Sequence, residues 1–265
     1  MTPEALLEHC DRGTLWSRED TAALFTDLGQ AYSSALAVRA LRQARGERPR
    51  GYKIGFTNRT IWDRYQVFAP IWGTVWDSTL TLAEGAGQID LSRTCQPRIE
   101  PEIVFGLRAT PIAGATLEDL FDALEWIAPG FEIVQTHAKD WKFTAAETVA
   151  DGGLHGRLLV GQRRPVRSIA SSAAVLDEML AKSRAVLSRQ ASVIEEGAGA
   201  NVLDSPLRAL HYFLNALRAC PGAPDLKAED LVTTGTWTDA WPVLPGQQWS
   251  VSFSAPLAGL QVTFT

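Results

Sequence analysis

Residues 98–106, RIEPEIVFG, place Glu100 and Glu102 two positions apart in a segment that otherwise has the composition of a β-strand. Residues two apart on a strand project from the same face, so these two carboxylates would stand side by side. Glu132 lies in a second strand-like segment, PGFEIV, and could supply a third carboxylate. Three carboxylates among apolar neighbours repel one another unless a positive charge lies between them.

A divalent cation is the expected occupant of such a cluster. Mg²⁺ and Mn²⁺ prefer oxygen ligands and would neutralise the converging carboxylates. The alternative is that the three glutamates line the solvated face of an ordinary half-buried sheet. The spacing alone does not separate the two interpretations, because Glu-X-Glu is a common string.

Two further charged residues lie in predicted strands. Lys53 stands in the alternating segment GYKIGFTN at residues 51–58. A lysine on a core strand needs a nearby anion or ligand, although its amine could also extend to the surface. Asp77 lies in the middle of PIWGTVWDSTLTL, at residues 70–82, an aromatic and β-branched run that is typical of a strand pair.

A glycine-containing turn is predicted at residues 151–156, DGGLHG. Gly152 and Gly153 would let the backbone approach a ligand closely, or would only allow the chain to turn. His155 lies in this turn and could act as an acid, a base or a substrate donor, whereas most isolated loop histidines have none of these roles.

The chain divides by pattern into two parts. Residues 1–50 are predicted to form a helical cap region, and residues 51–265 a β-rich region. The first region should contain one helix capped by Thr2 and ended by Gly13, and a longer one that begins near Ser17.

The β-rich region should carry a few helices among short strands. Residues 165–200 fit both a helix and a hairpin. The other expected elements are a loop at 85–93, a helix at 116–127, a strand at 129–134, a helix capped at 204–206 that runs to 219, and successive strands in the tail at 231–265.

Composition excludes several classes of protein. The 265 residues carry a formal net charge of −5, so there is no basic surface for nucleic acid. Three cysteines without metal or redox spacing indicate reduced thiols in a cytoplasmic protein. The N-terminus lacks the pattern of a signal peptide, and no run of apolar residues is long enough to span a membrane.

Taken together, these segments resemble a known family. The combination of the Lys53 strand, Asp77, the Glu-X-Glu strand, Glu132, ADGG (150–153) and TTGTWT (233–238) is similar to the 2-oxopent-4-enoate hydratase / 4-oxalocrotonate decarboxylase branch of the fumarylacetoacetate hydrolase superfamily. The resemblance runs over nearly the whole chain. It implies an α+β fold, a mixed β-roll with a smaller helical N-terminal region, that forms a homo-oligomer.

The resemblance also implies a divalent metal and a small 2-oxo or 2-hydroxydienoic acid substrate from the breakdown of aromatic rings. Association with a partner enzyme of the same pathway is a further implication. Carried over by position, Glu100, Glu102 and Glu132 match the metal ligands, and Lys53 and Asp77 match catalytic positions. The residues that match substrate-binding positions are Gly152, Gly153, Leu154, Thr236 and Thr238.

Two positions depart from the family pattern. The family's Asp-Asn-Ala-Ser is Asp-Gly-Gly-Leu here, so Leu154 replaces a serine implicated in hydration. His137 stands where an arginine often follows the third metal ligand by five places. His155 or Asp77 would then have to position water in a hydratase, whereas decarboxylation requires mainly an electron sink and a proton.

The resemblance therefore predicts a metal-dependent lyase, a hydratase first and a 4-oxalocrotonate-type decarboxylase as the alternative. Lys53 would orient the substrate carboxylate as a point charge or, with its pKa lowered by metal and burial, transfer a proton. An acylpyruvate hydrolase that uses His155 as its base is a further alternative. A partner subunit without catalytic activity is another, although a cluster of buried charges argues against it.

Overall fold

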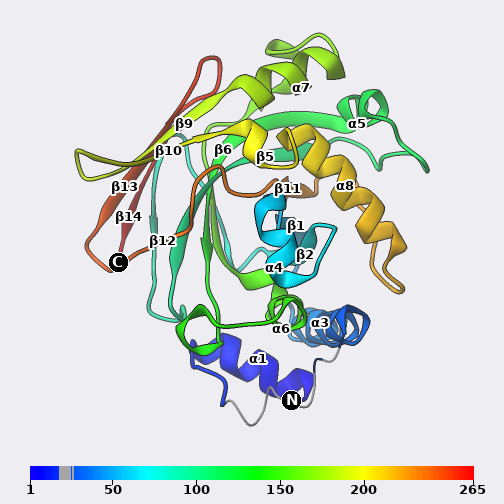
Figure 1. The fold of residues 1–265 in the computed structure, drawn as a ribbon, viewed down its shortest axis with the longest axis vertical. Helices are drawn as coiled ribbons and strands as arrows, with labels where there is room; N and C mark the ends of the chain where they lie inside the picture. Colours follow the sequence, from blue (N-terminus) through cyan, green and yellow to red (C-terminus); the bar gives the residue numbers. More distant parts are fainter. Residues whose placement is uncertain (18–24, 26) are drawn as a thin grey trace.

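The computed structural model describes residues 1–17, 25 and 27–265, and in this part of the chain the strands form two sheets (Figure 1). The first sheet has nine strands in the order β2-β1-β11-β5-β6-β7-β3, with β12 paired to β5 and β8 to β6. Their bounds are β1 Pro49–Gly55, β2 Ile71–Trp76, β3 Leu80–Leu82, β5 Arg98–Leu107, β6 Leu124–Val134, β7 His155–Val160, β8 Arg164–Pro165, β11 Leu231–Thr233 and β12 Trp241–Pro242.

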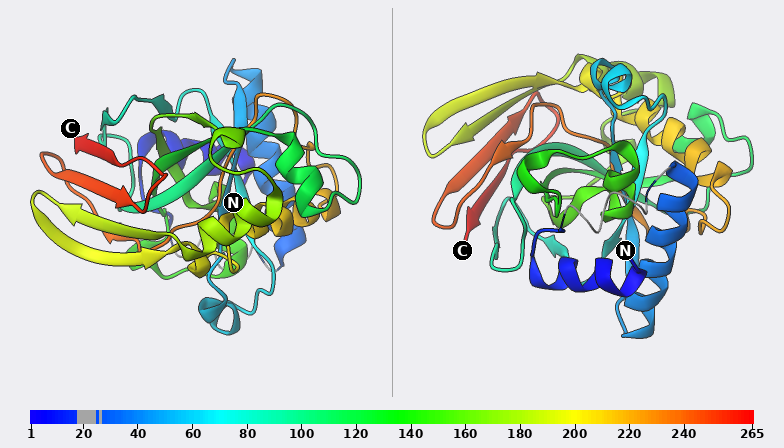
Figure 2. Two further views of the ribbon diagram at one scale, coloured as in Figure 1. Left: turned by 90° about the horizontal axis from the view of Figure 1, so that it is seen from above. Right: turned by 60° about the horizontal axis from the view of Figure 1, so that its bottom comes forward.

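The second sheet has five described strands in the order β10-β9-β13-β14-β4 and projects to one side of the molecule (Figure 2). These strands are β4 Ala86–Ile89, β9 Arg184–Arg189, β10 Ser192–Ala198, β13 Gln248–Phe253 and β14 Leu260–Phe264. Both sheets contain parallel and antiparallel strand pairs. The pairs β1–β11, β3–β7 and β4–β14 are parallel, and the other pairs are antiparallel. This curled, mixed architecture with helices confirms the predicted fold class.

Helices cover the first sheet in two groups (Figure 1). One group packs beside the N-terminus and comprises α1 Pro3–Arg12, α3 Leu28–Ala44 and α6 Ala145–Ala150. The other packs over the opposite part of the sheet and comprises α5 Leu117–Ala123, α7 Ala173–Lys182 and α8 Pro206–Ala219. A short helix, α4 Trp62–Tyr65, lies between β1 and β2 in the chain.

Local capping signals in the sequence are confirmed where the structure describes them. Thr2 accepts a hydrogen bond from the amide of Ala5, and Gly13 ends α1 in the left-handed conformation. Ser205 caps α8 in the same way, directly before Pro206. Such caps satisfy backbone groups that the helix leaves unpaired, which is why they can be recognised from short sequence patterns.

The described part of the second predicted helix is α3, which begins at Leu28. Asp27 caps α3, and Ser17 lies in coil outside it. Most of the predicted first turns, which follow Ser17, lie outside the described residues.

Three other boundaries differ from the sequence predictions. Residues 86–89, predicted as loop, pair with β14 as β4. The helix predicted over 116–127 ends at Ala123, because Leu124 and Ile127 join the long strand β6 and are buried in the sheet. The strand pair predicted at 70–82 is not a hairpin, since β2 pairs with β1 and β3 pairs with β7.

The ambiguous region at 165–200 contains both expected structures, α7 followed by the β9–β10 hairpin.

The register between β5 and β6 is the feature of the fold that matters most for function. Glu100 lies opposite Glu132, and Glu102 lies one same-face position further along β5. The sheet therefore brings together three carboxylates from segments thirty positions apart.

Candidate active site

Glu100, Glu102 and Glu132 form one compact cluster. Each offers a carboxylate oxygen, and these three oxygens all lie within 4.8 Å of one another. Glu102 and Glu132 are fully buried, and Glu100 is partly exposed. Among the described residues this is the one group of three or more potential ligands that could hold a metal ion. The solvated-face alternative does not fit this burial.

The electrostatics of the cluster fit a divalent cation. Burial, together with Glu132, raises the pKa of Glu100 to about 7, and burial and both neighbouring carboxylates raise the pKa of Glu102 well above its ordinary value. Glu102 accepts a hydrogen bond from the Gly235 amide through Oε2, at 2.7 Å, while its Oε1 has no hydrogen-bond partner. A buried carboxylate oxygen without a donor, beside two more carboxylates, is the environment that a hard cation would complete.

Lys53 supplies positive charge to this cluster. Its side chain is 4% exposed, and its Nζ lies 3.1 Å from Oε2 of Glu132. Burial acts to lower the pKa of Lys53, but the three glutamates outweigh it and the pKa is raised. The amine of Lys53 is therefore charged while the carboxylates carry no cation, as the role of a fixed point charge requires; a cation bound to the carboxylates would act in the opposite direction on its pKa.

His155 lies behind Glu132 and not in a turn, since it is the first residue of β7. Its Nδ1 lies 2.9 Å from Oε1 of Glu132, and its Nε2 lies 2.8 Å from Oγ1 of Thr79. A carboxylate only accepts hydrogen bonds, so Nδ1 donates to Glu132, and Nε2 shares a hydrogen bond with the Thr79 hydroxyl. Burial lowers the pKa of His155, which favours this neutral form. With both nitrogens engaged, His155 orients Glu132 and is not free to act on a substrate.

A cavity of about 420 Å³ opens in front of the cluster. Lys53 and Glu100 form part of its wall, with Gly153 and Leu154 beside them and Thr236 and Thr238 in the wall as well. The hydroxyl of Thr236 donates to the carbonyl of Thr238, and the hydroxyl of Thr238 donates to the carbonyl of Asp239. The two threonines therefore shape the loop and present hydroxyl oxygens as acceptors.

The turn at 152–154 has an unusual backbone. Gly152, Gly153 and Leu154 have φ angles of 64°, 69° and 66°, the left-handed region that leucine enters at a cost of about 1–2 kcal/mol. Asp151 anchors the turn, because its carboxylate accepts hydrogen bonds from the backbone amide and Nδ1 of His137 at 2.9 and 2.5 Å. This contact raises the pKa of His137 despite its burial. His137 thus holds the turn through Asp151.

Replacing two glycines in this region by alanine should reduce the stability of the fold by very different amounts. A Cβ on Gly73 would lie 1.8 Å from the carbonyl oxygen of Gly152, so we expect Gly73→Ala to destabilise the fold by about 3 kcal/mol or more. A Cβ on Gly152 would meet nothing within 4 Å, and Gly152→Ala should cost only the left-handed strain of about 1–2 kcal/mol. Denaturant unfolding of both variants measures the difference, and equal losses would contradict this packing.

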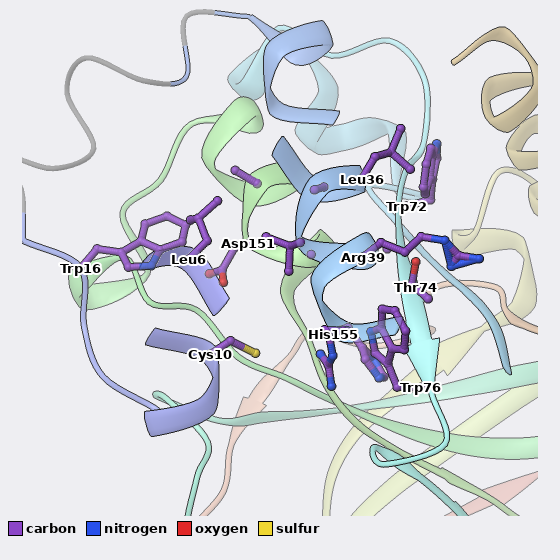
Figure 3. Close-up of a pocket in the computed structure, with 16 residues that line it drawn as sticks. Leu6, Cys10, Trp16, Leu36, Arg39, Trp72, Thr74, Trp76, Asp151 and His155 are labelled. Atoms are coloured by element: carbon purple, nitrogen blue, oxygen red, sulfur yellow. The ribbon is translucent and has the colours of Figure 1, made fainter. Parts of the chain in front are cut away.

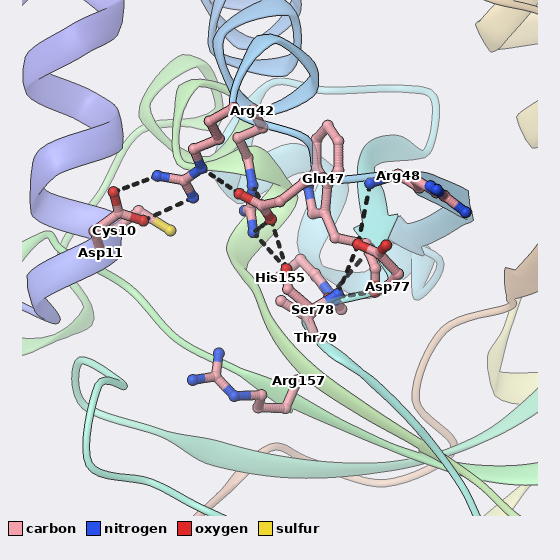
Figure 4. Close-up of polar contacts among 12 residues, drawn as sticks. Cys10, Asp11, Arg42, Glu47, Arg48, Asp77, Ser78, Thr79, His155 and Arg157 are labelled. Atoms are coloured by element: carbon pink, nitrogen blue, oxygen red, sulfur yellow. Dashed lines mark hydrogen bonds and ion pairs between the residues drawn. The ribbon is translucent and has the colours of Figure 1, made fainter.

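The structure does not bring Asp77 to the cavity. Asp77 is exposed in the turn after β2, where its carboxylate accepts hydrogen bonds from the amides of Arg48 and Ser78 (Figure 4). Lys53 pairs with Gly73 in the sheet, four positions before Asp77. The strand ends before the aspartate, so Asp77 closes a turn at the distant end of β2.

A smaller second cavity, of about 60 Å³, lies on the other side of the turn, among α1, α3 and β2 (Figure 3). Asp151, Gly152 and His155 face it, whereas Gly153 and Leu154 face the larger cavity. The turn is therefore a thin partition between the N-terminal helices and the candidate active site.

Three residues contribute to the site although the sequence patterns did not predict them as site residues. Gly235 binds Glu102 through its amide, Thr79 binds His155, and Arg98 lines the large cavity. The position of Arg98 could have been predicted from the sequence, because it shares the strand face of Glu100 and Glu102. The contacts of Gly235 and Thr79 could not, since each residue reaches its partner through pairing between distant strands.

Known proteins resemble this chain in sequence and in fold. No family model matches the sequence. The chain is 32% identical to 2-hydroxyhexa-2,4-dienoate hydratase of Comamonas testosteroni over 222 residues, which cover 83% of this chain and 80% of that one. It is 31% identical to 4-oxalocrotonate decarboxylase of a Pseudomonas species over 207 residues, 78% of this chain and 75% of the relative.

Solved structures share the fold. That of 4-oxalocrotonate decarboxylase from Pseudomonas putida G7, complexed with magnesium and adipate, matches with a TM-score of 0.88 at 24% identity and covers 99% of this chain and 95% of its own. The structure of fumarylpyruvate hydrolase from Pseudomonas aeruginosa, in complex with Mn²⁺ and pyruvate, matches with a TM-score of 0.61 at 14% identity. The match covers 82% of this chain and 89% of the hydrolase chain. None of the described helices combines the length and apolar composition that a bilayer crossing requires. The chain belongs to the family of lyases that comprises the 2-hydroxydienoate hydratases and the 4-oxalocrotonate decarboxylases, and it shares its fold with solved structures of the fumarylacetoacetate hydrolase superfamily.

Proposed function

We propose that this enzyme acts on a 2-oxo or 2-hydroxydienoic acid at the Glu100–Glu102–Glu132 cluster, with Mg²⁺ or Mn²⁺ held by the three carboxylates. The buried, mutually repelling carboxylates beside the cavity carry this proposal. The relatives in the family act on such acids, and the solved neighbours hold magnesium or manganese. A bound divalent cation would act as a Lewis acid toward the carboxylate and 2-oxo oxygens of the substrate.

Lys53 would hold the substrate carboxylate. Its ammonium group is buried at the cavity wall and already faces the cluster, so a substrate anion there gains a charge-assisted hydrogen bond in a desolvated site. Gly153 and Leu154 would form the wall against which the substrate lies, and the Thr236 and Thr238 loop would close the opposite side. Gly152 supports this wall from behind, next to β2.

Hydration remains the first candidate reaction, since the hydratases include the relative at 32% identity. Decarboxylation is the second candidate, and one observation favours it. Leu154 presents an apolar side chain in the cavity wall, and His155 is bonded at both ring nitrogens, so neither supplies a free group to position water. A hydratase would have to position its water through other groups, with Thr236 and Thr238 the polar side chains at hand.

Ultraviolet absorbance with purified protein tests the function. We expect Mg²⁺-dependent loss of the dienoate signal from 2-hydroxypenta-2,4-dienoate, or release of CO₂ from 4-oxalocrotonate, and no turnover of either after chelation with EDTA. The product distinguishes the two reactions. Full turnover in EDTA would contradict the metal site.

The remaining alternatives predict other outcomes. An acylpyruvate hydrolase would release two acids from an acylpyruvate, but it needs a base and His155 is not free to serve as one. A subunit without catalytic activity would show neither Mg²⁺ binding nor stabilisation by a pyruvate analogue on heating. We further infer a cytoplasmic homo-oligomer, consistent with the three free cysteines, and association with an enzyme of the same pathway.

A further inference from the structure

His137 and Asp151 form a buried pair at the turn between the two cavities, and the proposed chemistry does not use it. Nδ1 of His137 lies 2.5 Å from Oδ1 of Asp151, and the backbone amide of His137 donates to Oδ2 at 2.9 Å. The side chains of the two residues are 1% and 5% exposed. A short hydrogen bond in a desolvated place rigidifies the two segments that it joins.

The turn after Asp151 depends on such an anchor. Gly152, Gly153 and Leu154 all have left-handed backbone conformations, which are strained at the leucine. The amide of Leu154 donates to the carbonyl of Asp151 at 3.0 Å, and its carbonyl accepts from the amide of Gln135 at 2.9 Å. Gly153 and Leu154 line the large cavity. A shift of Asp151 would therefore move the wall against which the substrate is proposed to lie.

The ring of His137 is fixed on its face but has no second hydrogen bond. The indole of Trp16 stacks on it, with the ring centroids 5.9 Å apart and 24° between the ring planes. The amide of Trp16 also donates to the carbonyl of His137 at 2.7 Å. Nε2 of the ring is buried and has no partner among the described residues. Within this part of the chain, the charge of the ring therefore acts on the turn through Asp151.

Other titratable groups face this pair from the elements around it. They are Cys10 of α1, Cys95 before β5, Arg42 of α3, Glu147 of α6, His155 of β7, and Lys139 and Asp140 after the histidine. Burial raises the pKa of both thiols and lowers that of His155, so these three groups are neutral near pH 7. Arg42 is paired with Glu47 at 2.5 Å, and Glu147 caps the start of its own helix. Lys139 and Asp140 are exposed.

From this arrangement, and resting on the proposed function, we propose that His137 is a positioning residue with a pH-dependent effect on substrate binding. Its charged ring, through Asp151, holds the 152–154 turn in the shape that the substrate meets. When the ring loses its proton, a charge-assisted hydrogen bond becomes a neutral one, and the strained turn is held less firmly. His137 does not touch the substrate or the carboxylate cluster.

The direction of the pH effect follows from the environment of the ring. Burial acts to lower the pKa of His137, but Asp151 outweighs it and the pKa is raised. In the unfolded chain a histidine titrates near about pH 6.5. The pair therefore stabilises the turn in full below about pH 6.5, and this contribution is lost as the pH rises through the raised pKa of the folded state.

Binding of pyruvate, which carries the 2-oxo acid group alone, tests the proposal. Calorimetry on the intact protein with saturating Mg²⁺ should show about ten-fold weaker binding at about pH 9 than at about pH 6, as expected when a charge-assisted hydrogen bond becomes a neutral one. The carboxylate cluster can add a pH dependence of its own, so the comparison with variants decides the origin of the effect.

His137→Asn keeps a hydrogen-bond donor near the position of Nδ1 and removes the titrating ring. His137→Gln is a second neutral variant, which fills more of the space beside Trp16. Both should bind pyruvate as weakly at about pH 6 as the wild type does at about pH 9, with less than about a two-fold change between the two pH values. His211→Asn is the matched control and should keep the wild-type pH dependence, because His211 lies on α8 outside both cavities.

Hydrogen exchange at the Leu154 amide tests the turn without any ligand. At about pH 6 this amide should exchange about ten-fold faster in His137→Asn than in the wild type, whereas the amides of β5 should not change. Unchanged exchange at Leu154 would overturn the inference, and so would a pH dependence of pyruvate binding that both variants retain. Failure of pyruvate to bind any of these proteins with Mg²⁺ would overturn the proposed function instead, while the exchange measurement still decides whether His137 holds the turn.

Discussion

Glu102→Gln should reduce Mg²⁺-dependent turnover by at least about 1,000-fold, because stabilisation by a Lewis acid is worth several kcal/mol in the transition state. The substitution is nearly isosteric. The amide oxygen of glutamine can still accept the hydrogen bond from Gly235, while the amide NH₂ replaces the carboxylate oxygen that has no partner. The variant therefore removes the charge that a cation needs and leaves the loop contact in place.

Thermal unfolding with and without Mg²⁺ checks that the loss arises from the metal site. The wild-type protein should gain stability when Mg²⁺ binds, and Glu102→Gln should lose this gain. Without metal the variant should be at least as stable as the wild type, since one of three mutually repelling buried carboxylates is gone. Glu118→Gln is the control, because Glu118 also accepts a backbone amide hydrogen bond, from Ala173, on the exposed surface. A fully active Glu102→Gln enzyme would refute the metal assignment.

Lys53→Met should lower kcat/KM by about 100-fold or more, since a preorganised cation in a desolvated site is lost. The affinity of the same variant for Mg²⁺ should not fall. Lys53 pairs with Glu132, so its removal leaves the carboxylate cluster more negative and should keep or increase the affinity for Mg²⁺. Lys53→Met should therefore lose turnover and keep its metal affinity, whereas Glu102→Gln should lose both.

Calorimetry with Mg²⁺, followed by a 2-oxo acid, measures the two effects of Lys53→Met. The variant should bind the metal and bind the acid weakly. Lys182→Met serves as control, because Lys182 makes an exposed ion pair with Glu178 on α7. If Lys53→Met lost Mg²⁺ and kept the binding of the acid, Lys53 would be a structural counter-ion of the cluster and not the site of the substrate carboxylate.

Much of the local structure could be predicted from the sequence. Caps such as Thr2 and Ser205 depend on a side chain and an amide three residues away, so a short window contains both partners. The same holds for Glu100 and Glu102, whose common face follows from strand alternation alone. The family follows from combining several such segments along the chain.

Boundaries that depend on distant pairing could not be predicted in this way. Leu124 and Ile127 continue the helical stripe of α5, yet they belong to β6 because β5 offers a partner for this segment. Residues 86–89 look like a loop because the strand they pair with, β14, comes at the end of the chain. Tertiary pairing overrides weak local preference in both cases.

For the candidate site, the sequence by itself determined the carboxylate triad, Lys53 and the glycine-containing turn as the residues to consider. Only the tertiary structure decided their roles. It brought Glu132 opposite Glu100, placed His155 behind that carboxylate and Asp77 in a remote turn, and set the amide of Gly235 against Glu102. The reason is physical: residue types and spacing specify which groups a strand presents, whereas the sheet register and the packing around it specify which groups meet.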